Sequence, residues 1–179
     1  MRKLQIAVIG SAGPEEYQFR KPMTQMIGVA EIIGKELARS DCIVINGGKG
    51  GIMEAVSKGA KSLNGITVAE VSGNERFKSN QYTDIELVTG DVAFRGPSQL
   101  IGMSDAVISL GGGAGTLQEI AVAYRMQKPI ILLAGFGGWS DRLSRRKYLD
   151  ERRLVPFIVT NSAKSAVESC LKLLQLEVK

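Results

Sequence analysis

Five apolar runs of strand length recur along the chain, and each ends in a glycine-containing turn signal. They read LQIAVIG, CIVINGG, ITVAEVSG, AVISLGGG and PIILLAGFGG, at residues 4–10, 42–48, 66–73, 106–113 and 129–138. Their hydrophobicity is continuous rather than alternating, which is typical of strands that are covered on both faces. The pattern therefore predicts a buried parallel sheet.

Segments with helical periodicity separate these runs, at residues 23–40, 51–63, 92–104 and 116–127. A further strand over 156–160 and a helix over 162–176 complete the series. This alternation, with its short connections, predicts an α/β fold with a Rossmann-like, doubly wound parallel sheet. No repeat or composition break divides the chain, so we expect residues 1–179 to form a single nucleotide- or phosphate-binding domain.

The residue content excludes several kinds of chemistry. The sequence has no histidine, which excludes Ser-His and Cys-His nucleophile pairs and histidine-containing zinc sites. The two cysteines, Cys42 and Cys170, lack the spacing of metal ligands and fall in predicted buried elements. We therefore expect reduced, buried thiols and no metal site.

Charge and hydropathy limit the partners. The net charge of +5 is concentrated in DRLSRRKYLDERR at residues 141–153, where Arg146 and Asp150 are four apart, as on a solvated helix face. Tyr148 is the only aromatic residue there, so the stacking platform of single-strand binders is missing and nucleic acid is not an expected partner. No apolar run approaches the roughly 18 residues of a membrane helix, and the run over 4–9 is too short for a signal peptide. We expect a cytoplasmic protein without a membrane partner.

Four of the predicted strands lead into glycine-rich turns, and in a parallel sheet these turns share the carboxyl edge, where open α/β sheets bind ligands. Two of them, NGGKGGIMEA and GGGAGTLQE, also begin helices, whose first N–H groups attract phosphate. Neither turn fits the dinucleotide or P-loop fingerprint. An alternative is that the glycines only make tight turns. The predicted phosphate-binding residues are Gly10, Ser11, Gly47, Gly48, Lys49, Gly50, Gly112, Gly113, Gly115 and Thr116.

Glu119 has two interpretations. Its spacing from Thr116 fits a capping box, in which the carboxylate only stabilises the helix start. The same carboxylate could instead be catalytic, with Arg95 supplying a cation beside it. The spacing alone leaves both open. Trp139, the only tryptophan, could likewise stack on a planar ligand or serve packing.

The segments NGGKGGIMEAVSKGA and GGGAGTLQE resemble the two signature loops of the Lonely-guy family. The resemblance covers most of the chain and implies a Rossmann-like fold and a homodimer or higher homo-oligomer. Well-known members are phosphoribohydrolases that release cytokinin bases from nucleoside 5'-monophosphates. Carried over, the resemblance implies that Glu119 is the catalytic carboxylate, that Arg95 is its partner, and that phosphate is bound by Gly112, Gly113, Gly115 and Thr116.

Three positions depart from the family pattern. Gly111 replaces the proline of the second loop, Glu54 stands where the cytokinin enzymes have glycine, and Arg95 is followed by Gly-Pro. Together with GGWSDRLSRRKYLDERR, these departures resemble a prokaryotic branch with molybdenum-cofactor carrier-like proteins, which bind a phosphorylated pterin without turning it over. We predict a carrier-type binding protein for a phosphorylated nucleotide-like or pterin-like ligand such as molybdenum cofactor. The alternative is a nucleoside 5'-monophosphate phosphoribohydrolase, in which water attacks the ribose.

Overall fold

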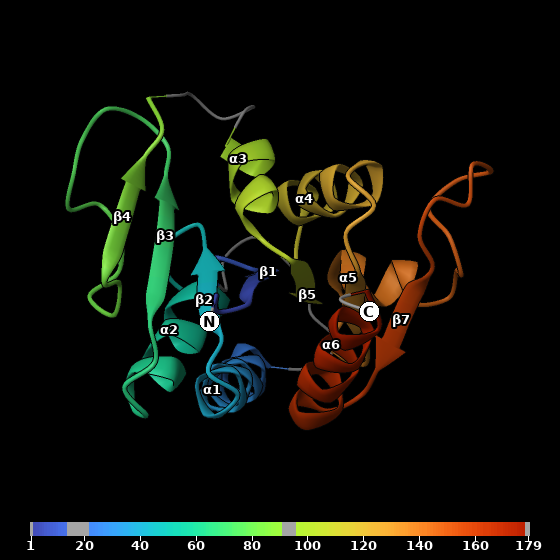
Figure 1. The fold of residues 1–179 in the computed structure, drawn as a ribbon, viewed down its shortest axis with the longest axis horizontal. Helices are drawn as coiled ribbons and strands as arrows, with labels where there is room; N and C mark the ends of the chain where they lie inside the picture. Colours follow the sequence, from blue (N-terminus) through green and yellow to red (C-terminus); the bar gives the residue numbers. More distant parts are fainter. Residues whose placement is uncertain (1, 14–21, 91–95, 178–179) are drawn as a thin grey trace.

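The computed structural model describes residues 2–13, 22–90 and 96–177. The strands are β1 (Gln5–Gly10), β2 (Ile43–Asn46), β3 (Thr67–Val71), β4 (Ile85–Val88), β5 (Ala106–Leu110), β6 (Ile130–Leu133) and β7 (Phe157–Thr160). The helices are α1 (Met23–Arg39), α2 (Ile52–Lys61), α3 (Gly96–Met103), α4 (Ala114–Arg125), α5 (Gly138–Leu143) and α6 (Ala163–Glu177). The strands form one sheet in the order β4-β3-β2-β1-β5-β6-β7, and every pair is parallel (Figure 1).

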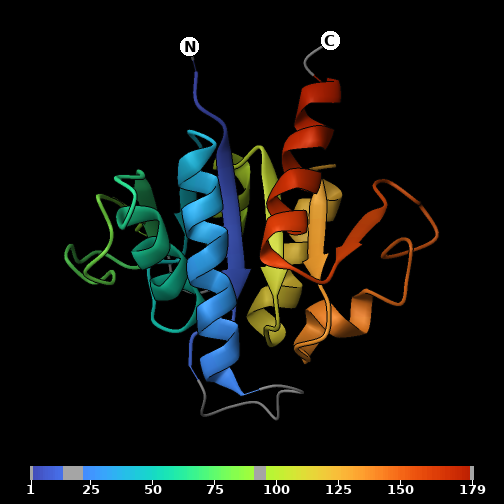
Figure 2. The same cartoon turned by 90° about the horizontal axis from the view of Figure 1, so that it is seen from below.

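Two hydrophobic clusters cover the two faces of this sheet. Within β5, Ile108 packs with residues of α1, α2 and α6, whereas its neighbour Val107 packs with residues of α3, α4 and α5. Successive strand residues point to opposite faces, so a strand between two helical layers must be apolar throughout. Figure 2 shows α1 and α6 side by side across one face. The predicted doubly wound α/β fold is confirmed.

Two short elements were not predicted. The strand β4 lies at the sheet edge, where Ile85 and Leu87 are exposed and alternate with half-buried residues. This alternation differs from the continuous apolar runs of the inner strands. The helix α5 begins at Gly138, so the run predicted as a strand over 129–138 ends as a strand at Leu133.

The helix predicted over residues 141–153 is wrong, because α5 ends at Leu143 and turns follow, although most of the basic side chains there are exposed as expected. The carboxylate of Asp150 accepts hydrogen bonds from Arg152 and from the Tyr124 hydroxyl, and this hydroxyl accepts one from the Leu154 N–H. Contacts with α4 thus anchor the segment instead of helical i,i+4 pairs. Cys42 and Cys170 are buried free thiols, as expected. Among the residues described, no helix is long and apolar enough to cross a membrane.

Candidate functional site

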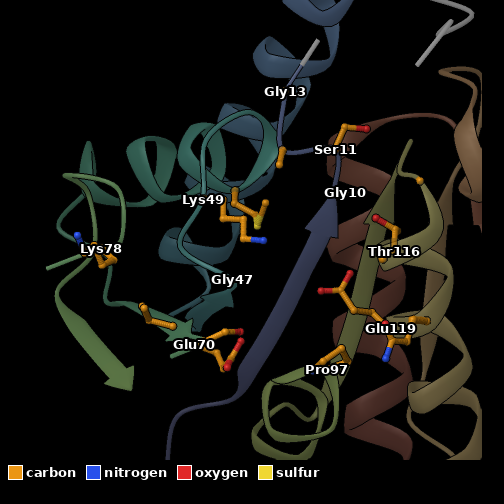
Figure 3. Close-up of a pocket in the computed structure, with 17 residues that line it drawn as sticks. Gly10, Ser11, Gly13, Gly47, Lys49, Glu70, Lys78, Pro97, Thr116 and Glu119 are labelled. Atoms are coloured by element: carbon orange, nitrogen blue, oxygen red, sulfur yellow. The ribbon is translucent and has the colours of Figure 1, made fainter. Parts of the chain in front are cut away.

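A cleft of about 810 Å³ lies at the carboxyl edge of the sheet, beside the β1–β5 pair. This pair is the point where the strand order reverses, because the chain proceeds from β1 toward β4 on one side and from β5 toward β7 on the other. Open α/β sheets bind ligands at such a point. Figure 3 shows the cleft between the turns that follow β1, β2 and β5.

The structure brings most of the predicted site residues together. Those that line the cleft are Gly10, Ser11, Gly47, Lys49, Gly113, Gly115, Thr116 and Glu119. The predicted Gly48, Gly50 and Gly112 do not line it, and Arg95 falls outside the described residues. Lining residues that were not predicted are Ala12, Gly13, Met53, Glu70, Val71, Ser72, Lys78, Pro97 and Gln118. Trp139 packs against the hydrophobic cluster under α4 and does not line the cleft.

Close backbone packing shapes the β5–α4 turn. Gly112 has φ +89°, and a Cβ there would lie 2.4 Å from the Thr116 side chain. Gly138 packs so closely that its Cβ would lie 2.5 Å from the carbonyl carbon of Gly111. The Trp139 N–H donates to the Gly112 carbonyl at 2.9 Å. These contacts leave no room for side chains at Gly112 and Gly138, so the glycines are needed for the turn itself.

The start of α4 is uncapped and faces the cleft. Gly113 is the N-cap residue, and none of the described side chains hydrogen-bonds this helix end. The helix begins at Ala114, so Thr116 is its third residue and not its cap. Of the two interpretations of Glu119, the capping box is therefore wrong, because the glycine turn starts the helix before Thr116. The first N–H groups of a helix have no internal acceptors and carry its positive dipole end, where negative charge is favoured.

Ser11 joins three of the turns. Its hydroxyl accepts a hydrogen bond from the Gly112 N–H at 3.0 Å, and its carbonyl accepts one from the Ile52 N–H at 3.0 Å. A Cβ at Gly51 would lie 2.4 Å from the same carbonyl oxygen. The Gly112 N–H is thus engaged within the protein, and the N–H groups at the start of α4 remain for a ligand.

Side chains brace the β2–α2 turn. Buried Asn46 accepts from the Gly48 N–H at 2.8 Å and donates to the Ser57 hydroxyl at 2.9 Å. Asn80, from the loop between β3 and β4, donates to the carbonyls of Gly48 and Lys49 at 3.1 and 3.2 Å. The turn places Lys49 on the cleft wall, with its amine directed inward (Figure 3). Asn46 ends an apolar run, and this was the only sequence signal for its role.

Two carboxylates face the cleft from opposite sides (Figure 3). Half-buried Glu119 projects from α4, and burial raises its pKa to about 7; the positive charge of Lys49 lowers this pKa and the negative charge of Glu70 raises it. Glu70 projects from β3 and is 6% exposed. The sequence feature that could have indicated this role of Glu70 is its position inside an apolar run. In the described parts of the chain, no group of three or more His, Cys, Asp or Glu side chains could hold a metal ion.

Known proteins resemble this chain over most of its length. The molybdenum cofactor carrier protein of Chlamydomonas reinhardtii superposes with a TM-score of 0.80 at 27% identity, covering 98% of this chain and 99% of that one. The molybdenum cofactor binding protein of Rippkaea orientalis gives 0.78 at 29% identity, with 100% and 99% coverage. A cytokinin riboside 5'-monophosphate phosphoribohydrolase of Mycobacterium tuberculosis is 26% identical over 82% of this chain and 86% of its own length.

The sequence also matches the sequence model of one protein family, over residues 3–167. This match covers the sheet from β1 to β7 and both glycine turns of the cleft. Together with the relatives above, it confirms the predicted Lonely-guy-like resemblance. The chain belongs to the SLOG cluster4 family.

Proposed function

We propose that this chain is a carrier-type binding protein that holds a phosphorylated pterin such as molybdenum cofactor in the cleft without turning it over. The observation that carries the proposal is the uncapped start of α4, which shares one cleft with the Lys49 side chain. Two full-length structural neighbours are named for carrying or binding molybdenum cofactor, which supports this ligand class.

The start of α4 is the favoured place for the phosphate. Gly113 and Gly115 have no side chains that could cover the first N–H groups, and the Thr116 hydroxyl lies beside them. A helix N-terminus stabilises an anion by about 0.3–1 kcal/mol. Each hydrogen bond to a charged phosphate adds about 1.5–3 kcal/mol. Lys49 offsets the repulsion that a phosphate would meet from the Glu119 carboxylate.

The rest of the cleft suits a flat polar ring. Its volume of about 810 Å³ lies in the range of small-molecule sites, about 300–1,000 Å³. Met53, Val71 and Pro97 supply apolar wall, and Glu70, Ser72 and Gln118 supply polar groups. A heterocycle with polar edges can use both kinds of wall at once.

The test uses the full chain and molybdenum cofactor released from a molybdoenzyme. At a ligand concentration a hundred times Kd, binding stabilises the folded state by about 2.7 kcal/mol. For a chain of this size, the melting temperature should rise by about 5–10 °C, and the cofactor should be recovered unchanged. Lys49→Met is the variant, because Lys49 is exposed and lines the cleft; relative to its own unliganded melting temperature, it should lose most of the rise. Failure of the cofactor to raise the melting temperature would overturn the proposal.

Glu119 favours a second candidate, hydrolysis of nucleoside 5'-monophosphates. Its carboxyl group faces the cleft, does not cap α4, and has a pKa of about 7, close to that of an effective general acid or base. The phosphoribohydrolase among the relatives supports this reaction class at lower identity. Incubation with AMP should then release adenine, measured by chromatography, and Glu119→Ala should abolish the release. Equal release by both proteins, or none by either, would exclude this reaction.

A further inference from the structure

We propose that Glu70 recognises the heterocyclic ring of the bound ligand by hydrogen bonding. Its carboxylate would accept two adjacent N–H groups on one edge of a heterocycle, an arrangement that guanine and pterin present and adenine lacks. This inference rests on the proposed function, because it names the ring that the cleft prefers once a phosphorylated ligand is bound.

Glu70 is an unusual residue for its place. It lies in β3, next to the strand's last residue, and is 6% exposed. Glutamate is depleted in strands and is almost never buried unless it is paired. No described lysine or arginine forms an ion pair with it. A packing role would be served better by an apolar residue, so the carboxylate needs another explanation.

Two neighbouring elements hold this carboxylate in place. The Thr89 hydroxyl, just after β4, donates to Oε1 of Glu70 at 2.7 Å. Gly96, the first residue of α3, lies so close that its Cβ would be 3.0 Å from both carboxylate oxygens. The charge therefore sits at the positive end of the α3 dipole, where negative charge is favoured. A preorganised acceptor of this kind loses little freedom on binding.

Among the described residues, hydrogen bonds engage only one of the two carboxylate oxygens of Glu70. Oε1 accepts the bond from Thr89, and no hydrogen bond to Oε2 arises from the described residues. Figure 3 shows the Glu70 carboxylate directed into the cleft, facing the side of Glu119. A buried carboxylate with an empty lone pair costs free energy until a donor arrives. The cleft thus presents an acceptor that a ligand can satisfy.

The position of Glu70 matches the ring end of a phosphorylated ligand. The phosphate is placed at the start of α4, which follows β5, whereas Glu70 lies on β3. β1 and β2 lie between these strands, so β3 and β5 are three strand spacings apart, about 14 Å. This is the scale of an extended nucleoside or pterin phosphate with its hydrogen bonds. Met53 and Pro97 line the same cleft and offer apolar surface to a ring.

The chemistry of the ring edge gives the specificity. Guanine and pterin carry a ring N–H beside an exocyclic amino group, so both donors can meet one carboxylate. Adenine carries an amino group beside an acceptor nitrogen, which would face a carboxylate oxygen without a proton between them. Sites that hydrogen-bond a ligand reject analogues that leave their polar groups unpaired. We expect a preference of tenfold to a hundredfold for the two-donor edge.

The first experiment ranks ligands by isothermal titration of the full chain with GMP, IMP, AMP and a 6-substituted pterin phosphate. We expect GMP and the pterin phosphate to bind at least tenfold more tightly than AMP, with IMP between them because it keeps the ring N–H and lacks the amino group. This ranking needs no variant, so it tests the inference even if a variant fails to fold. AMP binding as tightly as GMP would overturn it.

The second experiment compares Glu70→Gln with Glu54→Gln as the matched control. Glu54 lies in the first turn of α2 near the cleft but does not line it. Glu70→Gln should weaken GMP and pterin phosphate at least tenfold, leave inorganic phosphate unchanged, and abolish the preference over AMP. Glu54→Gln should keep the wild-type ranking. An unchanged ranking in Glu70→Gln would overturn the inference.

Other outcomes separate this inference from the proposed function. Tight binding of the pterin phosphate that Glu70→Gln does not affect would overturn the role of Glu70 and leave the carrier function standing. Absence of binding by every phosphorylated heterocycle would overturn both. Magnesium or zinc could satisfy the same carboxylate. Stabilisation by either metal alone that is lost in Glu70→Gln would assign Glu70 to a cation instead, and would also overturn the inference.

Discussion

Two glycine turns border the same cleft, yet they are held in different ways. The β5–α4 turn is held by backbone crowding, because side chains at Gly112 and Gly138 would collide with their neighbours. The β2–α2 turn is braced by hydrogen bonds from Asn46 and Asn80. The first turn presents backbone N–H groups to the cleft, and the second presents the charge of Lys49. Similar glycine runs can therefore place different groups, backbone N–H groups and a lysine side chain, at one cleft.

The largest expected loss of stability comes from Gly112→Ala, which adds a side chain to the crowded β5–α4 turn. Its Cβ would lie 2.4 Å from the buried Thr116 side chain, at a φ of +89° that alanine rarely adopts. Overpacking and backbone strain each cost about 1–3 kcal/mol, so we expect a loss of about 3–4 kcal/mol. Urea denaturation measures this loss. A loss below 1 kcal/mol would mean that the turn can relax and is not held by crowding.

The second-largest effect on stability is expected at Glu119, which follows the β5–α4 turn. The folded-state pKa of Glu119, about 7, lies above its unfolded value of about 4.3, so the folded state binds the proton more tightly. The stability from this proton is fully present below about pH 4 and is lost as the pH rises through 7. Glu119→Gln should match the wild type near pH 4 and be more stable by about 2–3 kcal/mol near pH 8.

Lys49 belongs to the β2–α2 turn, yet its charge acts on Glu119, which follows the β5–α4 turn. Its positive charge lowers the pKa of Glu119, so Lys49→Met should raise this pKa and move the midpoint of the pH-dependent loss of stability to a higher pH. Thermal melts at a series of pH values, at constant ionic strength, measure both variants. A stability difference between Glu119→Gln and the wild type that does not change with pH would contradict the placement of Glu119 in this cleft.

The sequence predicted the inner part of the fold because every inner strand is covered on both faces. β1, β2, β5 and β6 appear as continuous apolar runs, and glycine ends them. The edge strand β4 alternates exposed Ile85 with half-buried Glu86, so it lacks this signal. The charges at residues 141–153 have helical spacing, but a tertiary contact of Asp150 with Tyr124 and a local contact with Arg152 hold that segment in turns. A local sequence pattern does not indicate the tertiary contact with Tyr124.

The site was predicted where backbone chemistry defines it and missed where side chains converge from distant strands. The turn at Gly113 and Gly115 has a local glycine signature, and the structure places both in the cleft. Glu70 meets the cleft only because β3 lies near β1 in the sheet order, which no local pattern encodes. The spacing of Thr116 and Glu119 left capping and catalysis open, and the capping interpretation fails because Gly113, not Thr116, is the N-cap residue. The sequence GGGAGTLQE is compatible with a helix whose N-cap is Gly113 and with one whose N-cap is Thr116.

A smaller effect is expected at the braced turn. Asn46→Ala removes the acceptor for the Gly48 N–H and the donor to the Ser57 hydroxyl, both in buried surroundings. Buried polar groups without partners cost about 1–3 kcal/mol, so we expect a loss of about 2 kcal/mol by urea denaturation. Asn80→Ala should cost less, because Asn80 is only half-buried and water can replace its bonds. Equal losses in the two variants would mean that Asn46 does not brace the turn from within.

The smallest effect on stability, and the sharpest contrast with Gly112, is expected for Gly115→Ala. A Cβ at Gly115 meets no atom within 4 Å, and the residue is helical. Alanine is favoured over glycine in a helix by up to about 1 kcal/mol, so stability should stay equal or rise. The new methyl group would stand beside the open N–H groups of α4, and we expect phosphate-bearing ligands to bind about tenfold more weakly, about 1.4 kcal/mol. Urea denaturation and titration calorimetry measure the two effects separately. Unchanged affinity would place the phosphate away from α4, because a ligand that contacts these N–H groups cannot avoid the methyl group.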